Sequence, residues 1–221
     1  MQATPRTLSS PALEAQDFHS GSSYARGAQH PPLIEQTLGA FMDGMVARHG
    51  AAEALVCVHQ GLRYTYAQLQ QAARQLASAL LRQGLQPGDR VGIWSHNNAE
   101  WVLLQLATAE VGLVLVNINP AYRTSELEYA LNKVGCKALV SMRAFKTSRY
   151  LEMVRELAPE LATCPAGRLA ARRLPLLRLV CWIDVAGQGD DEAGMLRFSD
   201  LFAQGDPEDA AVARIAGSLD A

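Results

Sequence analysis

Four polar or aromatic side chains follow two apolar runs at the points where those runs should end as strands. His96 and Asn97 follow the first run, and Asn119 and Tyr122 follow the second. If both runs are parallel strands, these loops lie at the carboxyl edge of one sheet, where α/β proteins bind their ligands. Imidazole and amide groups can donate hydrogen bonds to a substrate, and the ring of Tyr122 can line an apolar slot. The pattern indicates a candidate substrate-binding site.

A structural interpretation of the same loops stays open beside the functional one. Asn117, Asn119 and Pro120 are residues typical of turns, and Asn97 or its neighbour Asn98 can cap the helix that follows. On this interpretation the polar side chains shape the backbone and bind no ligand.

Motifs for common reactions are missing from the sequence. There is no glycine-rich dinucleotide fingerprint, no phosphate-binding P-loop, no nucleophile elbow and no histidine pair with zinc-ligand spacing. The acidic run Asp190-Asp191-Glu192 is flanked by glycine and suits a solvated loop better than acid–base catalysis. The sequence therefore predicts no catalytic residue and no metal site in this chain.

Two successive strand–helix units should position the candidate site. Their first strand is apolar throughout, which predicts that both its faces are covered. The helix after it is apolar nearly all round, so we expect it to be buried in the interior, Trp101 included. Thr124 should cap the second helix. The predicted elements are the strand Val91–Trp94, the helix that ends near Glu110, the strand Leu113–Ile118, the helix from Thr124 to Gly135 and the strand Ala138–Ser141.

Local signals predict the flanking elements. Thr65 and Gln68 have the spacing of a capping box at the start of a helix. Gln60-Gly61 between two β-prone runs is typical of a hairpin. These elements are the helix from Leu38 capped by Thr37, the hairpin strands Ala54–His59 and Leu62–Tyr66, the helix around Leu151–Leu157 and the strand Leu179–Ile183. Beyond a Gly/Asp-rich loop the chain is loosely patterned. The expected fold class is α/β, a mostly parallel layered sheet with helices on both faces, preceded by a β-hairpin.

Composition narrows the class of protein. The 221 residues are 49% apolar and carry a formal net charge of -2, which argues against a nucleic-acid binder. Four widely separated cysteines suit buried free thiols in a reducing compartment, so we expect a cytoplasmic protein. No apolar run approaches the length of a membrane span.

The first 32 residues differ from the rest of the chain. They are rich in serine, alanine, glutamine, glycine and proline and lack the apolar core of a secretory signal. Glu14 and Asp17 weigh against a mitochondrial transit peptide. We expect residues 1–32 to be a flexible leader and residues 33–221 to form one α/β subdomain.

Several short pieces occur together in an order and spacing that resemble a known family. They are Arg63-Tyr64-Thr65-Tyr66, Gly88-Asp89-Arg90-Val91-Gly92-Ile93-Trp94, Asn98-Ala99-Glu100-Trp101, Val116-Asn117-Ile118-Asn119-Pro120-Ala121-Tyr122-Arg123 and Glu126-Leu127-Glu128-Tyr129-Ala130-Leu131. In combination they resemble the amino-terminal part of the AMP-forming acyl-CoA synthetases, from about Ser22 to Ile183. The run from Asn117 to Arg123 is most similar to the branch that acts on medium- or long-chain fatty acids.

The resemblance implies a two-step reaction for a parent enzyme. A fatty-acid carboxylate attacks the α-phosphate of Mg-ATP to give an acyl-adenylate and pyrophosphate, and the thiol of CoA then displaces AMP. Fatty acid, ATP and CoA are the implied partners of the full-length enzyme. Peripheral membrane contact and self-association through exposed apolar surface are further interactions left open.

This sequence departs from the family pattern at decisive places. It has no Ser/Thr/Gly-rich phosphate loop ending in Pro-Lys-Gly, none of the family's acidic adenine and ribose motifs, and no mobile carboxyl-terminal domain with its lysine. His96-Asn97 stands where relatives show Pro-Asn, so the resemblance implies no role for His96. We expect a subdomain truncated before the ATP phosphate loop, inactive alone and binding no cofactor. The alternatives are a fragment of an aryl- or amino-acid-adenylating enzyme, or a non-catalytic interaction module.

Overall fold

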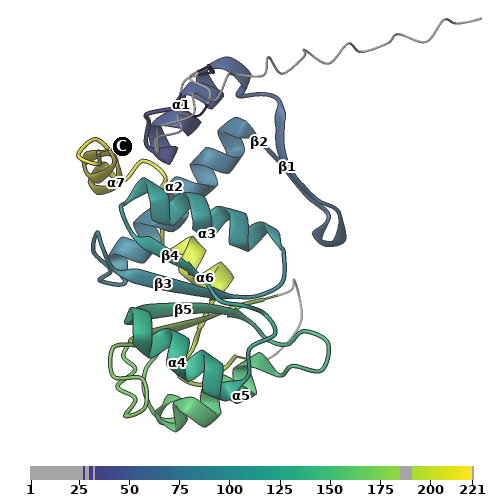
Figure 1. The fold of residues 1–221 in the computed structure, drawn as a ribbon, viewed down its shortest axis with the longest axis vertical. Coiled ribbons are helices and arrows are strands. Elements are labelled where there is room, and N and C mark those ends of the chain that lie inside the picture. The colour runs from purple at the N-terminus through teal and green to yellow at the C-terminus, as the bar shows by residue number, and fades with distance from the viewer. Residues whose placement is uncertain (1–26, 28–29, 32, 185–190, 221) are drawn as a thin grey trace, which may run out of the picture. The chain divides into compact units, whose positions relative to one another are not determined.

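Five parallel strands form the central sheet of the protein, in a computed structural model that describes residues 27, 30–31, 33–184 and 191–220 (Figure 1). Their order across the sheet is β4-β3-β5-β6-β7, and every neighbouring pair is parallel. The strands are β3 (Arg90–Trp94), β4 (Val114–Asn117), β5 (Cys136–Met142), β6 (Leu179–Ile183) and β7 (Leu196–Arg197). All five residues of β6 are buried, as expected for a strand covered on both faces.

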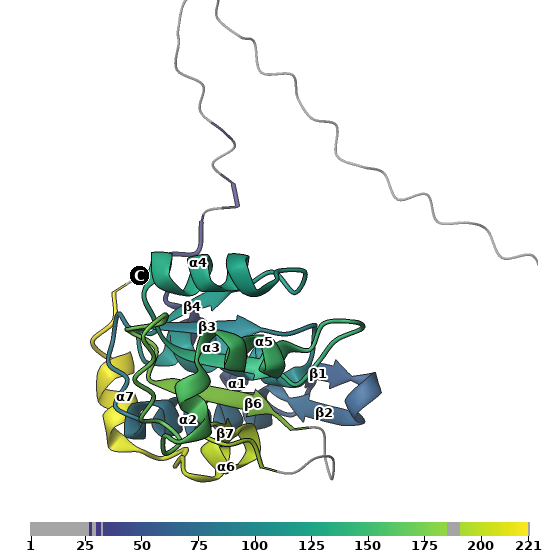
Figure 2. The same cartoon turned by 90° about the horizontal axis from the view of Figure 1, so that it is seen from below.

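Helices cover both faces of this sheet, which confirms the predicted α/β fold class. The crossover from β3 to β4 and the crossover from β4 to β5 run in opposite directions, so right-handed connections place their helices on opposite faces. Figures 1 and 2 show α2, α3 and α6 on one side of the strands and α4 and α5 on the other. The helices are α2 (Tyr66–Arg82), α3 (Ala99–Glu110), α4 (Thr124–Val134), α5 (Tyr150–Leu157) and α6 (Phe198–Ala203).

Two further helices pack on this arrangement from outside the sheet. Helix α1 (Leu38–His49) contacts α2 and α3, and helix α7 (Ala210–Ala216) contacts the same two helices. Thr37 caps α1 as predicted, since its side-chain oxygen accepts a hydrogen bond from the backbone N–H of Ala40 at 3.2 Å. The described part of the chain contains no helix long and apolar enough to cross a membrane.

The predicted hairpin is present, with one correction at its turn. Strand β1 (Glu53–Cys57) pairs antiparallel with β2 (Leu62–Thr65). The first strand ends at Cys57 and not at His59, because Val58–Gln60 form a single 3₁₀ turn that is closed by the N–H of Gly61 on the carbonyl of Val58. Gly61 has φ +67°, a conformation that glycine adopts without strain. The turn lifts His59 out of the strand.

Two other details of the sequence prediction are wrong. Helix α3 is not enclosed all round, because Gln105 is exposed and Trp101 is only partly buried. Thr124 is the first residue of α4 and not its cap. Arg123 is the cap residue, and its backbone N–H donates to the carboxylate of Glu126 at 3.1 Å.

The capping box that begins α2 is confirmed. The side-chain oxygen of Thr65 accepts from the backbone N–H of Gln68, and the side chain of Gln68 accepts from the backbone N–H of Thr65. Because both bonds form between residues three apart, the signal needs no tertiary context.

All four cysteines are free thiols, as predicted. Burial raises the pKa of Cys136 to about 11 and raises the pKa of the fully enclosed Cys181 as well. Thiols held in the neutral form are poor nucleophiles and poor metal ligands, so these two cysteines act as small apolar core residues.

The chain divides into two compact units, Met1–Ile34 and Glu35–Ala221. Within the first, residues 27, 30–31 and 33–34 form no helix or strand. The rest of the predicted flexible leader lies outside the described residues, and its flexibility stays a prediction.

Candidate functional site

The carboxyl ends of β3 and β5 form the place where this sheet can bind a ligand. The chain leaves β3 toward α3 on one face and leaves β5 toward α5 on the other, so the two loops diverge above neighbouring strands. Such divergence opens a crevice in doubly wound sheets, and ligands bind there. Figure 1 shows the tip of the β1–β2 hairpin on the same side as the carboxyl ends of the strands.

His96 lines this crevice. Its ring stacks on the ring of Phe145 from the loop after β5, with centroids 4.7 Å apart and planes at 12°. The ring of His59, from the 3₁₀ turn of the hairpin, also lies near it, 5.9 Å away at 42°. Three segments that are distant in the sequence therefore meet at one imidazole.

A hollow of about 350 Å³ opens beside these rings, within the size range of small-molecule sites. Its wall is mostly polar on the hairpin and α3 side, whereas β5 and β6 contribute the apolar side chains of Met142 and Ile183. The lining residues are His59, Gln60, Leu62, His96, Asn98, Glu100, Met142, Ile183 and Asp184.

Partial burial favours the neutral form of His96. Desolvation lowers the pKa of the imidazole, and the nearby His59 lowers it further, while Glu100 acts in the opposite direction. Its Nδ1 atom is buried and has no hydrogen-bond partner in the described part of the chain. A neutral imidazole offers a stacking surface and one further hydrogen bond. It has no positive charge with which to attract an anion.

Acidification is expected to destabilise the protein partly through His96. Because the folded-state pKa lies below the value of about 6.5 in an unfolded chain, the unfolded chain binds a proton first as the pH falls. The contribution of the neutral His96 to the free energy of unfolding is complete above about pH 6.5. It is lost as the pH falls through the folded-state pKa. Urea midpoints measured at about pH 7.5 and 5.5 should fall less in His96→Asn than in the natural chain. Both proteins retain His59, Glu100 and Asp184, which face the same hollow, so an equal fall would assign the effect to another group.

Gln60 ties the hairpin to the start of α3. Its side-chain oxygen accepts from the backbone N–H of Ala99 at 2.7 Å, and its amide nitrogen donates to both carboxylate oxygens of Glu100 at 3.0 and 2.8 Å. Asn98 completes the end of the helix by accepting from the backbone N–H of Trp101 at 2.9 Å. These side chains satisfy N–H groups that an anion would otherwise bind.

Gln60→Ala is expected to lower the free energy of unfolding by about 1–2 kcal/mol, because it leaves the N–H of Ala99 and the carboxylate of Glu100 without this partner. The matched control is Gln105→Ala, the same exchange at an exposed position of α3, which should change stability by less than about 0.5 kcal/mol. Urea denaturation measures both. A similar loss of stability in the two variants would contradict the conclusion that Gln60 stabilises the contact between the hairpin and α3.

The four residues predicted as a substrate site have different places in the structure. His96 and the exposed Asn97 border the crevice, where a second, open hollow is lined by both of them together with His59 and Pro120. The structure therefore brings His96 and Asn97 together at the crevice.

Asn119 and Tyr122 have structural contacts instead. The side chain of Asn119 accepts from the backbone N–H of Ala121 at 2.9 Å, and its carbonyl accepts from the indole N–H of Trp94 at 3.1 Å. Tyr122 is partly buried against the core. These two residues shape the loop, and neither lines the hollows at the crevice. Their part in substrate binding stays a prediction.

An apolar slot adjoins the hollow and shares Leu62, Glu100 and Asp184 with it. It measures about 230 Å³, and Asp184 is fixed at its edge by hydrogen bonds from the backbone N–H and hydroxyl of Ser199 at 3.1 and 2.8 Å. The remaining lining residues are Tyr64, Ala99, Leu103, Phe198 and Phe202. A slot with this lining can enclose an apolar group whose polar end faces the histidines.

Sequence reasoning missed His59, Gln60, Phe145 and Asp184. Gln60 was assigned only to a turn, and His59 to a strand. No local pattern links any of these residues to His96, because the contacts depend on how the hairpin folds over the sheet.

Among the described residues, no group of three or more His, Cys, Asp or Glu side chains could hold a metal ion. The carboxylates Glu100 and Asp184 are held by Gln60 and Ser199. The donor set at the crevice does not fit Mg²⁺, which requires near-octahedral oxygen ligands.

Residues 43–178 match the family model described as AMP-binding enzyme. The mouse protein named medium-chain acyl-CoA ligase ACSF2, mitochondrial, is 42% identical over 188 residues, which cover 85% of this chain and 30% of that protein. A Bacillus subtilis protein named putative acyl-CoA synthetase YngI is 36% identical over 151 residues, or 68% of this chain and 28% of that protein. The chain thus spans about a third or less of the curated relatives it matches.

Solved structures share the fold. A crystal structure of the anthranilate CoA ligase AuaEII with anthranoyl-AMP has a TM-score of 0.64 at 21% identity, and the match covers 79% of this chain and 29% of that one. The amino-terminal domain of FACL13 from Mycobacterium tuberculosis has a TM-score of 0.56 at 17% identity, covering 78% and 37%. At these identities the likeness extends to the fold alone.

Proposed function

Because the chain belongs to the AMP-binding enzyme family, we propose that it is the amino-terminal subdomain of an ATP-dependent, AMP-forming ligase that joins medium- or long-chain fatty acids to CoA. The observation that carries the proposal is the family match together with 42% identity to a medium-chain acyl-CoA ligase. The proposed full-length reaction converts a carboxylate and ATP to an acyl-adenylate and pyrophosphate, and then converts the acyl-adenylate and CoA to a thioester and AMP.

Within that enzyme the chain is proposed to act as a scaffold that borders the substrate cavity. The ring of His96 and the apolar slot beside it supply a surface for stacking and apolar contact. The described residues do not fit Mg²⁺, and the sequence lacks a phosphate-binding loop. The chain alone is therefore proposed to be inactive and to bind no cofactor.

A chimera tests the function. The 188-residue segment of the mouse relative that matches this chain is replaced by the corresponding residues of this chain, and pyrophosphate release is measured with octanoate, ATP and CoA. We expect activity within about tenfold of the unmodified mouse protein, because the two segments should support the same site. The mouse protein without the segment serves as the inactive control.

Substrate choice in the same assay separates the alternatives. Preference for octanoate or palmitate supports the fatty-acid proposal. A folded chimera that uses only an aromatic acid such as anthranilate would favour an aryl-adenylating parent instead. A folded but inert chimera would contradict the proposed function.

Interactions and location are part of the proposal. Fatty acid, ATP and CoA are proposed as ligands of the full-length enzyme, with no nucleic acid. A cytoplasmic location is proposed from the four free cysteines and the acidic residues of the leader, whereas the mouse relative's name includes "mitochondrial". Fluorescent fusion of residues 1–221 tests the location, and import into mitochondria would contradict it.

A further inference from the structure

The amino ends of the strands form a surface on the opposite side of the sheet from the crevice. This surface crosses four neighbouring strands, from β4 through β3 and β5 to β6. Three aliphatic side chains are exposed there, those of Val114 (47%), Val134 (36%) and Leu176 (48%). Val114 begins β4, whereas Val134 and Leu176 belong to the segments that lead into β5 and β6. This end of the sheet is therefore partly apolar.

Basic side chains lie next to the aliphatic ones. Arg90 is the ladder partner of Val114, and its guanidinium donates to the carbonyl of Val134 at 2.7 Å. A Cβ atom at Gly135 would lie 2.8 Å from Nη2 of Arg90 and 3.1 Å from Cδ1 of Leu176, so both side chains cover this glycine. Apolar and basic groups thus alternate on one surface.

Exposed cations extend this surface. Lys133 precedes Val134 at the end of α4, and Arg178 directly precedes β6. Arg168 lies beside Arg178, because the backbone N–H of Leu169 donates to the carbonyl of Arg178 at 3.0 Å. We call this surface the amino edge, and its exposed residues are Val114, Lys133, Val134, Arg168, Leu176 and Arg178.

The amino edge carries positive charge in excess. Its three exposed cations form no ion pair with a carboxylate of the described residues. Two carboxylates on adjoining segments already have partners, since Asp89 pairs with Lys137 at 2.7 Å. Glu128 likewise pairs with Arg173 at 2.6 Å. Residues 161–183 contain four arginines and no acidic residue.

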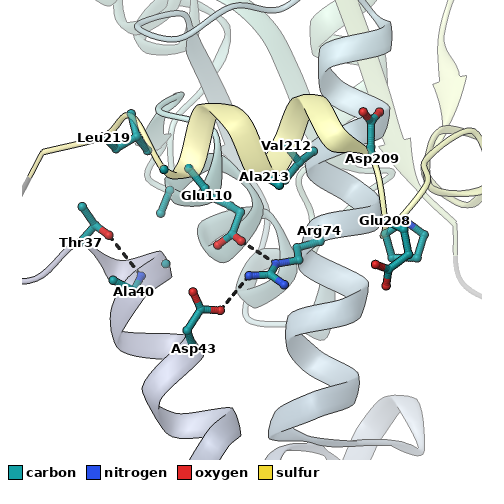
Figure 3. Close-up of a pocket in the computed structure, with 15 residues that line it drawn as sticks. Thr37, Ala40, Asp43, Arg74, Glu110, Glu208, Asp209, Val212, Ala213 and Leu219 are labelled. Atoms are coloured by element: carbon teal, nitrogen blue, oxygen red, sulfur yellow. Dashed lines mark hydrogen bonds and ion pairs between the residues drawn. The ribbon is translucent and has the colours of Figure 1, made fainter.

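Charged groups between α1, α2 and α7 show the opposite situation. Figure 3 shows Arg74 between the carboxylates of Glu110 and Asp43, and its guanidinium donates to each at 2.7 Å. Asp209 at the start of α7 lies 3.7 Å from Arg82. These arginines are compensated within the chain, whereas the amino edge presents its charge to a partner outside it.

We propose that the amino edge docks on an anionic lipid surface. Phosphate headgroups complement its cations, and one Lys or Arg near such a surface strengthens binding by about fivefold. Aliphatic side chains between the cations can enter the boundary between headgroups and acyl chains. The exposed residues of the amino edge include no aromatic ring, which disfavours a protein partner and single-stranded RNA. Docking in this way leaves the crevice on the side that faces away from the lipid.

Co-sedimentation of the 221-residue chain with lipid vesicles tests the proposal. Phosphatidylcholine vesicles with about one third phosphatidylglycerol should bind the chain at least about tenfold more tightly than vesicles of phosphatidylcholine alone. Raising the NaCl concentration to about 0.5 M should release the chain, because salt screens the attraction between exposed charges.

Single substitutions locate the contact. Lys133→Gln and Arg168→Gln should each weaken binding to the anionic vesicles by about fivefold. The matched control is Arg48→Gln, which removes an exposed arginine of α1 outside the amino edge and should leave binding unchanged. Leu176→Ser should weaken binding by about threefold, and its control is Val58→Ser at the 85% exposed turn of the hairpin. Thermal midpoints check that every variant is folded.

Several results would overturn the proposal. They are absence of binding, equal binding to both kinds of vesicle, and equal weakening by Arg48→Gln, because the charge of the amino edge would then not direct the contact. Release by inorganic phosphate at constant ionic strength would show a site for a single phosphate in place of a lipid surface. Tighter binding of polyuridylate than of the anionic vesicles would assign the amino edge to RNA and reject a lipid partner.

Discussion

Trp94→Ala is expected to lower the free energy of unfolding by about 3–5 kcal/mol. Trp94 ends β3 with no exposed surface, and its ring lies 4.1 Å from the ring of Tyr150 on α5. Its indole N–H donates to the carbonyl of Asn119. The substitution therefore leaves a cavity next to Tyr150 and removes a donor from a loop at the carboxyl edge. Urea denaturation followed by circular dichroism measures the loss.

Trp101→Ala is the matched comparison, because it removes the same side chain from the next helix. Trp101 is only partly buried, so its loss should cost about 1–2 kcal/mol. Equal losses of stability in the two variants would contradict the full burial of Trp94 and the partial burial of Trp101. The contrast also corrects the expectation from hydrophobic pattern alone, which placed Trp101 in the core.

Strands buried on both faces were predictable because their pattern is local and simple. Strands β3 and β6 have continuous apolar runs, and the structure encloses both. The capping box of α2 was equally clear, since its two hydrogen bonds join residues three apart. Signals of this kind are complete within a few residues.

The end of the chain could not be predicted in the same way. Strand β7 has two residues, and α6 and α7 have six and seven, so none is long enough to establish a period. Tertiary contacts determine them: the side chain of Gln75 donates to the carbonyl of Phe202, and Ser78 on α2 donates to Asp209 at the cap of α7. These partners lie far away in the sequence.

Of the candidate site, the sequence predicted the place and only part of the composition. Strand-end loops identified His96 and Asn97 because parallel strands bring their carboxyl ends to one edge. The partners of His96 come from the hairpin and from the loop after β5, and no spacing in the sequence indicates them. The side chain of Asn119 accepts a hydrogen bond within its own turn, and its predicted contact with a substrate stays a prediction.

The 221-residue chain alone is expected to bind Mg-ATP no more tightly than about millimolar and to form no acyl-adenylate. A triphosphate requires many convergent backbone N–H donors together with a cation. At the crevice those donors are already used, because Gln60 accepts from Ala99 and Asn98 accepts from Trp101. The few side-chain donors left contribute about 1 kcal/mol each, against an association cost of at least about 4 kcal/mol.

Two measurements on the purified chain check both halves of this expectation. Calorimetric titration with Mg-ATP reports binding, and a pyrophosphate-release assay with octanoate reports adenylation, with the mouse relative as the positive control. The purified protein must be free of host acyl-CoA synthetases, because a trace of such an enzyme would itself release pyrophosphate slowly when octanoate is added. Micromolar affinity, or steady release that persists through repeated purification, would mean that the described strand-end loops hold a nucleotide site. Loss of that affinity in Gln60→Ala or His96→Asn would then locate the site at the crevice, since both side chains line it.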